Sequence, residues 1–135
     1  MESPSAAITT MEQRYKYALS LLVEQKYIIA IKEFESIINT APDSEYAEVS
    51  QINIGRTYFL NGDYKRALKA YEKVLEKYPG TKKTEEILER EYQLGIAQMD
   101  TNEEAAIKVF EKIIEKHHLG PVAPDAQIKI ADCYF

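Results

Sequence analysis

Apolar residues recur at helical spacing along most of the chain, and short breaks rich in polar residues, glycine or proline separate the periodic segments. One example is the stripe formed by Ala30, Phe34, Ile37 and Ile38, which would face a core from one side of a helix. The alternation of apolar and polar residues that is typical of a strand does not appear. The periodicity predicts an all-α chain with helices at about 11–24, 27–39, 45–60, 64–77 and 82–99, one that ends near 116, and one that starts at Pro124.

Residues that favour helix ends support these boundaries. Thr9 and Thr10 each have a Glu or Gln three residues on, and Asp100 and Thr101 each have a Glu there, which is the capping-box pattern. Gly62 can adopt the positive φ that ends a helix, and the Asp after it can cap the next helix. We therefore expect capping boxes at these four positions and a tight turn at Gly62.

One pair of helices recurs at a fixed offset of 37 positions. The matched residues are small, aromatic or proline, and they lie at Ala18 and Gly55, Tyr27 and Tyr64, Ala30 and Ala67, Phe34 and Tyr71, and Pro42 and Pro79. Gly55 and Ala67 would lie where two helix backbones approach closely, and the aromatic side chains would fill the space around them. The offset predicts a repeat protein.

Two further copies of the pattern follow. Gly95, Ala106 and Phe110 occupy the places of Gly55, Ala67 and Tyr71 in a third pair of helices. The phrase IADCY at 130–134 then repeats IGRTY at 54–58, and no second helix follows it in the sequence. The chain should therefore contain three helical pairs and the first helix of a fourth.

These repeats resemble the tetratricopeptide repeat family over essentially the whole chain. The resemblance implies a right-handed superhelix of about seven antiparallel helices with a concave and a convex face. Residues 1–10 would form an N-terminal linker, and residues 11–135 a TPR-like domain. The repeats would span about 11–42, 43–79, 80–121 and, in part, 122–135.

Two longer phrases narrow the resemblance: YPGT at 78–81 followed by YQLG at 92–95, and GPVAPDA at 120–126 followed by IADCYF at 130–135. They are similar to phrases of the BamD-type lipoproteins that assemble outer-membrane β-barrels, and of their relative, the periplasmic coordinator of the Tol–Pal system. The resemblance implies scaffolding or substrate capture during outer-membrane biogenesis and a periplasmic location. The alternative is a generic cytoplasmic TPR adaptor, or a regulatory part of a larger multidomain protein.

The first helix of each repeat would line the concave face and form a groove for a peptide or helical segment of another protein. Most of the candidate residues are apolar, which suits a hydrophobic partner segment. The alternative is that neighbouring helices cover these residues as core. The candidate groove residues are Tyr15, Leu19, Leu22, Ile52, Arg56, Phe59, Leu60, Tyr92, Ile96 and Met99.

The carboxylate clamp with which some TPR proteins bind chaperone C-termini is not matched. Of the five corresponding positions only Asn53 has the required residue type, and Glu89 is acidic where the clamp needs a cation. We therefore do not expect a partner of that class.

A row of lysines recurs every four residues along the helix expected at 64–77. It could meet an acidic partner, but two glutamates are interleaved with it, so a solvated and salt-bridged face is the favoured interpretation. The lysines are Lys65, Lys69, Lys73 and Lys77, and the glutamates are Glu72 and Glu76.

Composition excludes several classes of protein. The net charge of −5 argues against a nucleic-acid binder, which would usually carry a basic surplus. The apolar runs are too short to cross a bilayer, so no transmembrane segment is expected. The first residues lack the cationic start and apolar core of a signal peptide.

No residue pattern indicates catalysis, a metal or a cofactor. His117 and His118 are adjacent, so on a helix their side chains diverge by about 100° and would rarely bind one ion together. Cys133 lies beside expected core positions and is more typical of a small hydrophobic residue than of a nucleophile. A hydrolase that uses His118 and Cys133 is the enzymatic alternative.

The sequence thus predicts a non-catalytic scaffold whose partners are other proteins. The helix from Pro124 onward has apolar residues on one side and no following helix to cover them. Self-association through this helix is therefore a further expectation.

Overall fold

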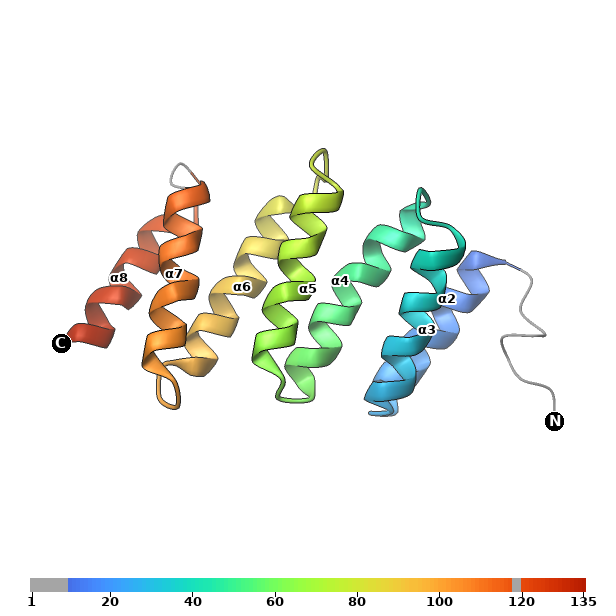
Figure 1. Cartoon of the computed structure of the whole chain (residues 1–135), viewed down its shortest axis with the longest axis horizontal. Helices are drawn as coiled ribbons and strands as arrows, with labels where there is room; N and C mark the ends of the chain where they lie inside the picture. The colour runs from blue at the N-terminus through green and yellow to red at the C-terminus, as the bar shows by residue number, and fades with distance from the viewer. Residues whose placement is uncertain (1–9, 118–119) are drawn as a thin grey trace. The chain divides into compact units, whose positions relative to one another are not determined.

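The computed structural model describes residues 10–117 and 120–135, and all regular structure in that part of the chain is helical (Figure 1). Each predicted helix is present with ends within two residues of those expected, so the all-α prediction is confirmed. The predicted linker at 1–10 lies outside the described residues except for Thr10. The helices are α2 (Met11–Val23), α3 (Tyr27–Thr40), α4 (Glu45–Leu60), α5 (Tyr64–Lys77), α6 (Thr84–Gln98), α7 (Glu103–His117) and α8 (Ala123–Tyr134).

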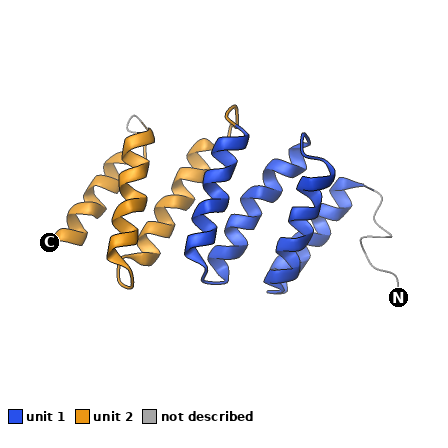
Figure 2. Cartoon of the chain, in the orientation of Figure 1, with its two compact units in different colours: residues 1–78 blue, residues 79–135 orange. Residues whose placement is uncertain are grey.

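The chain divides into two compact units, residues 1–78 and residues 79–135 (Figure 2). The division falls next to Pro79, where the second predicted repeat ends. In the first unit α2 packs against α3, α3 against α4 and α4 against α5, and α2 also contacts α4. In the second unit α6 packs against α7 and α7 against α8.

In the second and third repeats, an aromatic ring from the second helix packs against a glycine of the first helix. A Cβ atom added to Gly55 would lie 2.6 Å from Cδ1 of Tyr71, and one added to Gly95 would lie 2.7 Å from Cζ of Phe110. The sequence analysis placed a close approach of two backbones at Gly55, but the nearest atoms belong to the Tyr71 ring. Gly55 is therefore needed because a side chain would displace an aromatic ring from the core.

Ala18 and Phe34 occupy the corresponding places in the first repeat, and both are fully buried. They belong to one core cluster in the first unit, which also includes Leu21, Ile37 and Ile54. The repeat pattern in the sequence therefore marks the residues that hold each pair of helices together.

The turns within the first two repeats share a left-handed residue. Gly62 has φ of +81°, as expected, and Gln25, which lies 37 positions earlier, has φ of +63°. The side chain of Asp63 then accepts a hydrogen bond from the N–H of Arg66 at 3.1 Å and caps α5. The two turns thus have the same backbone design, although only one of them uses glycine.

The capping-box pattern predicted the cap correctly at α2 and wrongly at α7. Thr10 accepts a hydrogen bond from the N–H of Gln13 at 3.1 Å and caps α2, whereas Thr9 lies outside the described residues. Asp100 and Thr101 were expected to cap α7, but Oδ1 of Asn102 accepts from the N–H of Ala105 at 3.2 Å. Asn is as good an N-cap as Asp or Ser. The N-cap of α7 is therefore Asn102, one residue after the last position that the capping-box pattern indicated.

Candidate protein-binding surfaces

The predicted groove residues lie on the first helices of the repeats and differ in exposure. Side chains that are buried inside the protein offer little surface to a partner, so Leu22 and Ile52 are poor candidates. The other eight are open to contact to different degrees. Tyr15, Leu19, Phe59, Tyr92, Ile96 and Met99 are half-buried, Arg56 and Leu60 are exposed, and Leu22 and Ile52 are buried.

Tyr15 joins α2 to α4 at the predicted groove in the first unit. Its hydroxyl oxygen accepts a hydrogen bond of 2.7 Å from Nδ2 of Asn53, which also donates to the carbonyl of Val49 at 3.0 Å. The centroid of the Tyr15 ring lies 6.1 Å from that of the Phe34 ring and 5.8 Å from that of the Tyr46 ring. Because the Asn53 side chain already uses both of its N–H groups, it has none left to hold a carboxylate, which agrees with the mismatch to the clamp.

Three residues near the end of α4 form the open part of this surface. Phe59 packs against Tyr64 with ring centroids 5.5 Å apart and is only half-buried. Leu60 and Arg56 are exposed. We call Arg56, Phe59 and Leu60 the α4 surface, which offers one cation beside two apolar side chains.

The second unit carries a separate set of predicted residues on α6. Tyr92 packs against Phe110 with ring centroids 5.7 Å apart, and Ile96 near the end of α6 and Met99 just after it are half-buried. Burial raises the pKa of Tyr92, and the negative charges of Asp125, Glu89 and Asp132 raise it further. The Tyr92 hydroxyl therefore stays protonated and available as a hydrogen-bond donor up to strongly alkaline pH.

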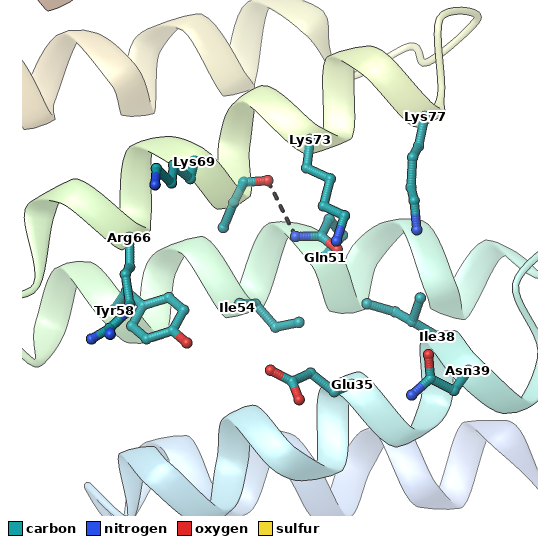
Figure 3. Close-up of a pocket in the computed structure, with 11 residues that line it drawn as sticks. Glu35, Ile38, Asn39, Gln51, Ile54, Tyr58, Arg66, Lys69, Lys73 and Lys77 are labelled. Atoms are coloured by element: carbon teal, nitrogen blue, oxygen red, sulfur yellow. Dashed lines mark hydrogen bonds between the residues drawn. The ribbon is translucent and has the colours of Figure 1, made fainter.

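A cavity of about 420 Å³ lies between α3 and α5, with α4 as its floor (Figure 3). This cavity was not predicted from the sequence, because three helices form it and not the first helices of the repeats alone. In Figure 1, α3 and α5 lie on the near side of α4. The cavity is lined by Glu35, Ile38, Asn39, Gln51, Ile54, Tyr58, Arg66, Lys69, Ala70, Lys73 and Lys77.

The lysines of α5 were expected to form a solvated, salt-bridged face, and three of them line this cavity. Lys69, Lys73 and Lys77 are exposed, as a solvated face requires. The four-residue spacing of these lysines was the signal that they share one side of α5. Their position beside a cavity could not be predicted from the spacing along α5 alone, because residues of α3 and α4 form the rest of the cavity.

Two polar contacts shape the cavity wall. Nε2 of Gln51 donates to the carbonyl oxygen of Ala70 at 3.3 Å, which ties the floor helix α4 to α5. Arg66 pairs with Asp63, with Nη1 and Oδ2 2.8 Å apart. The N–H of Arg66, and then its guanidinium, keep the pKa of Asp63 below its ordinary value, so this pair stays ionised at neutral pH.

The described residues give no support to a metal or nucleophile site. No group of three or more potential metal ligands occurs among them. Burial lowers the pKa of His117, and His118 lies outside the described residues. Burial, together with the charges of Glu103 and Asp132, raises the pKa of Cys133, so its thiol stays protonated.

Within the described residues, none of the helices combines the length and the apolar character that crossing a membrane requires.

Helix α8 exposes Ile128 and Tyr134 to solvent.

Solved structures with the same fold confirm the repeat assignment. Two crystal structures of a Podosopora anserina protein, described as a kinesin light chain with nearly identical TPR-like repeats, match with TM-scores of 0.52 and 0.51. In both, the identity is 20%, and the match covers 99% of this chain and 68% of the other. A search of curated proteins found no match.

The model of the YfiO family, described as outer membrane lipoprotein, matches residues 8–105, which is more than half of the chain. Together with the TPR fold, this match supports a protein-interaction scaffold. It also agrees with the BamD-type resemblance seen in the sequence motifs. The chain therefore belongs to the YfiO family of outer membrane lipoproteins.

Proposed function

We propose that this protein is a non-catalytic scaffold that binds segments of other proteins during the assembly of outer-membrane β-barrels. The observation that carries the proposal is the family match over residues 8–105 on a fold built of TPR repeats. An outer membrane lipoprotein family favours a periplasmic location at the outer membrane over the alternative of a cytoplasmic adaptor.

The α4 surface is the best candidate for a partner-binding site in the first unit. Exposed Leu60 and half-buried Phe59 can bury apolar area against a partner, at about 25 cal/mol per Å² removed from water. Exposed Arg56 can pair with a carboxylate beside them. An unfolded β-barrel chain offers both kinds of group, because its strands alternate apolar and polar residues.

Tyr92, Ile96 and Met99 are the corresponding candidates in the second unit. Tyr92 offers an aromatic face and a hydroxyl donor, and Met99 a flexible apolar side chain that adapts to different partners. Tyr15 and Leu19 are weaker candidates, because the Tyr15 hydroxyl and ring already have partners inside the unit.

The test is binding of a urea-unfolded, fluorescently labelled outer-membrane β-barrel protein that is diluted into buffer with the intact chain. The Arg56→Glu/Leu60→Ser variant should bind about tenfold more weakly, since an ion pair and an apolar contact are lost together. Lys32→Glu, a change of equal charge at an exposed position on α3, is the matched control and should bind as the original chain does. Equal binding by all three proteins would contradict the proposed surface, and no binding by the original chain would contradict the proposed function.

Self-association through α8 stays a prediction. Ile128 and Tyr134 are exposed on this helix and could pack against a second copy. Light scattering of the intact chain and of an Ile128→Ser variant would test it, and a monomer at high concentration of the original chain would contradict it.

A further inference from the structure

The cavity between α3 and α5 carries a strong excess of positive charge. Arg66, Lys69, Lys73 and Lys77 line it, and Glu35 is the carboxylate among its lining residues. Arg66 is already paired with Asp63, so the three lysines supply the charge that is open to a ligand. In Figure 3, Lys73 and Lys77 extend from α5 over α4, and Glu35 points toward the cavity from α3.

The spacing of the lysines sets the spacing of the charges that they could bind. Residues four apart on a helix are separated by about 6 Å along its axis. Alternate residues of an extended chain lie about 6.6 to 6.8 Å apart and point the same way. Carboxylates at alternate positions of an extended segment therefore match Lys69, Lys73 and Lys77 one for one.

The rest of the cavity suits a peptide backbone. Asn39 and Tyr58 provide side-chain hydrogen-bonding groups, and Ile38 and Ile54, which are largely buried, add a small apolar surface. An extended segment also carries backbone N–H groups that can donate to the carboxylate of Glu35. The phosphodiester group of a lipid or nucleic acid is itself only a hydrogen-bond acceptor, so Glu35 would repel it.

We propose that this cavity is a second binding site, which takes an extended acidic peptide segment with carboxylates at alternate positions. It is formed by α3, α4 and α5 and does not include the residues of the α4 surface. It therefore does not depend on the function proposed above. The net charge of −5 on the whole chain also disfavours a long polyanion such as nucleic acid over a short acidic segment.

The test uses a fluorescein-labelled seven-residue peptide with glutamate at its second, fourth and sixth positions and serine elsewhere. Binding to the intact chain is measured by fluorescence anisotropy at low and at high salt. The same peptide with glutamine in place of glutamate is the ligand control. The protein variants are Lys73→Glu, which reverses the central charge, and Lys65→Glu, the matched change on the same helix outside the cavity.

The expected result is binding of the glutamate peptide but not of the glutamine peptide, and loss of affinity at high salt. Lys73→Glu should weaken binding by about tenfold, since one attraction is replaced by a repulsion. Lys65→Glu should change it by less than about twofold. Circular dichroism should show the same helicity for all three proteins, because both lysines are exposed.

Three outcomes would overturn the proposal. An equal effect of Lys65→Glu and Lys73→Glu would show that only the overall charge of α5 matters. Absence of peptide binding at low salt would show that the cavity does not take such a segment. Tighter, Lys73-dependent binding of a short single-stranded oligonucleotide or of phosphatidylglycerol vesicles would assign the cavity to another class of ligand.

Discussion

The ring of Tyr71 lies directly over Gly55, in the space that a side chain on Gly55 would occupy. Phe110 lies over Gly95 in the same way in the second unit. In each case the glycine comes from the first helix of a repeat and the ring from the second helix. The two glycines are 40 positions apart and the two rings 39, so the same contact recurs in both repeats despite a one-residue difference in spacing.

Replacing Gly55 with Ala should lower the free energy of unfolding by up to about 2 kcal/mol. Overpacking a well-filled core costs about 1 to 3 kcal/mol, and the better helix propensity of Ala returns about 1 kcal/mol. Thermal unfolding followed by circular dichroism would measure this. Gly80→Ala is the control and should be nearly neutral, because a Cβ there meets nothing within 4 Å.

A double variant separates packing from other effects. If the clash with the ring is the cause, adding Tyr71→Leu to Gly55→Ala should cost less than the sum of the two single changes. Strict additivity of the two effects would show that the ring is not what excludes a side chain at Gly55.

Replacing Gln25 with Gly should raise the free energy of unfolding by about 0.5 to 1 kcal/mol. The left-handed conformation of Gln25 costs a residue with a side chain about 1 to 2 kcal/mol. Glycine avoids this strain but loses about 0.5 to 1 kcal/mol of chain entropy on folding. Chemical denaturation would measure the change. Gln25→Ala keeps the backbone strain and should leave the free energy of unfolding unchanged. A loss of stability in Gln25→Gly would show that the side chain of Gln25 makes stabilising contacts in the folded protein.

The neutral form of His117 should be favoured in the folded protein. Burial, and then the charge of Lys116, lower its pKa below the ordinary value of 6.5. The unfolded chain therefore takes up a proton first as the pH falls, so the stability that this residue contributes is present above pH 6.5 and is lost on acidification. An NMR titration of the imidazole Cε1–H signal would check the direction, with His117→Gln used to assign the signal.

A pKa for His117 at or above 6.5 would contradict this expectation. The pH dependence of thermal unfolding gives an independent check, because His117→Gln should lose less stability than the original chain between pH 7.5 and pH 5.5. An unchanged pH dependence in the variant would point to carboxylates as the source of the effect.

Cys133 should react slowly with alkylating reagents. Burial, Glu103 and Asp132 all raise its pKa, and the thiolate is the reactive form. Alkylation by iodoacetamide at pH 8, followed by mass spectrometry, should be slower in the folded protein than in the same protein unfolded in urea. A faster reaction in the folded state would revive the hypothesis of a nucleophilic cysteine.

The sequence predicted those features that depend on residues close together along the chain. The helices follow from apolar periodicity, and the turn at Gly62 with its Asp63 cap follows from residue types with strong local preferences. The wrong cap at α7 came from the same local rules, since Asn102 competes with Asp100 and Thr101 within three residues.

Features that depend on several helices were harder to predict. Leu22 and Ile52 have the same helical spacing as the more exposed groove candidates, and only the packing of neighbouring helices shows that they are buried. The sequence placed the lysines of α5 beside Glu72 and Glu76 on one helix, but it does not show which other helices face them. Their position over a cavity needs α3 and α4 as well.

Lys69, Lys73 and Lys77 line the cavity at four-residue intervals along α5, so their fields add along its length. An approaching acidic chain would feel this attraction over about one Debye length, roughly 10 Å at 0.1 M salt, before any contact forms. Lys69, Lys73 and Lys77 would then act mainly on the association rate, and the short-range contacts inside the cavity on the dissociation rate. Added salt should consequently slow association while leaving the dissociation rate nearly constant.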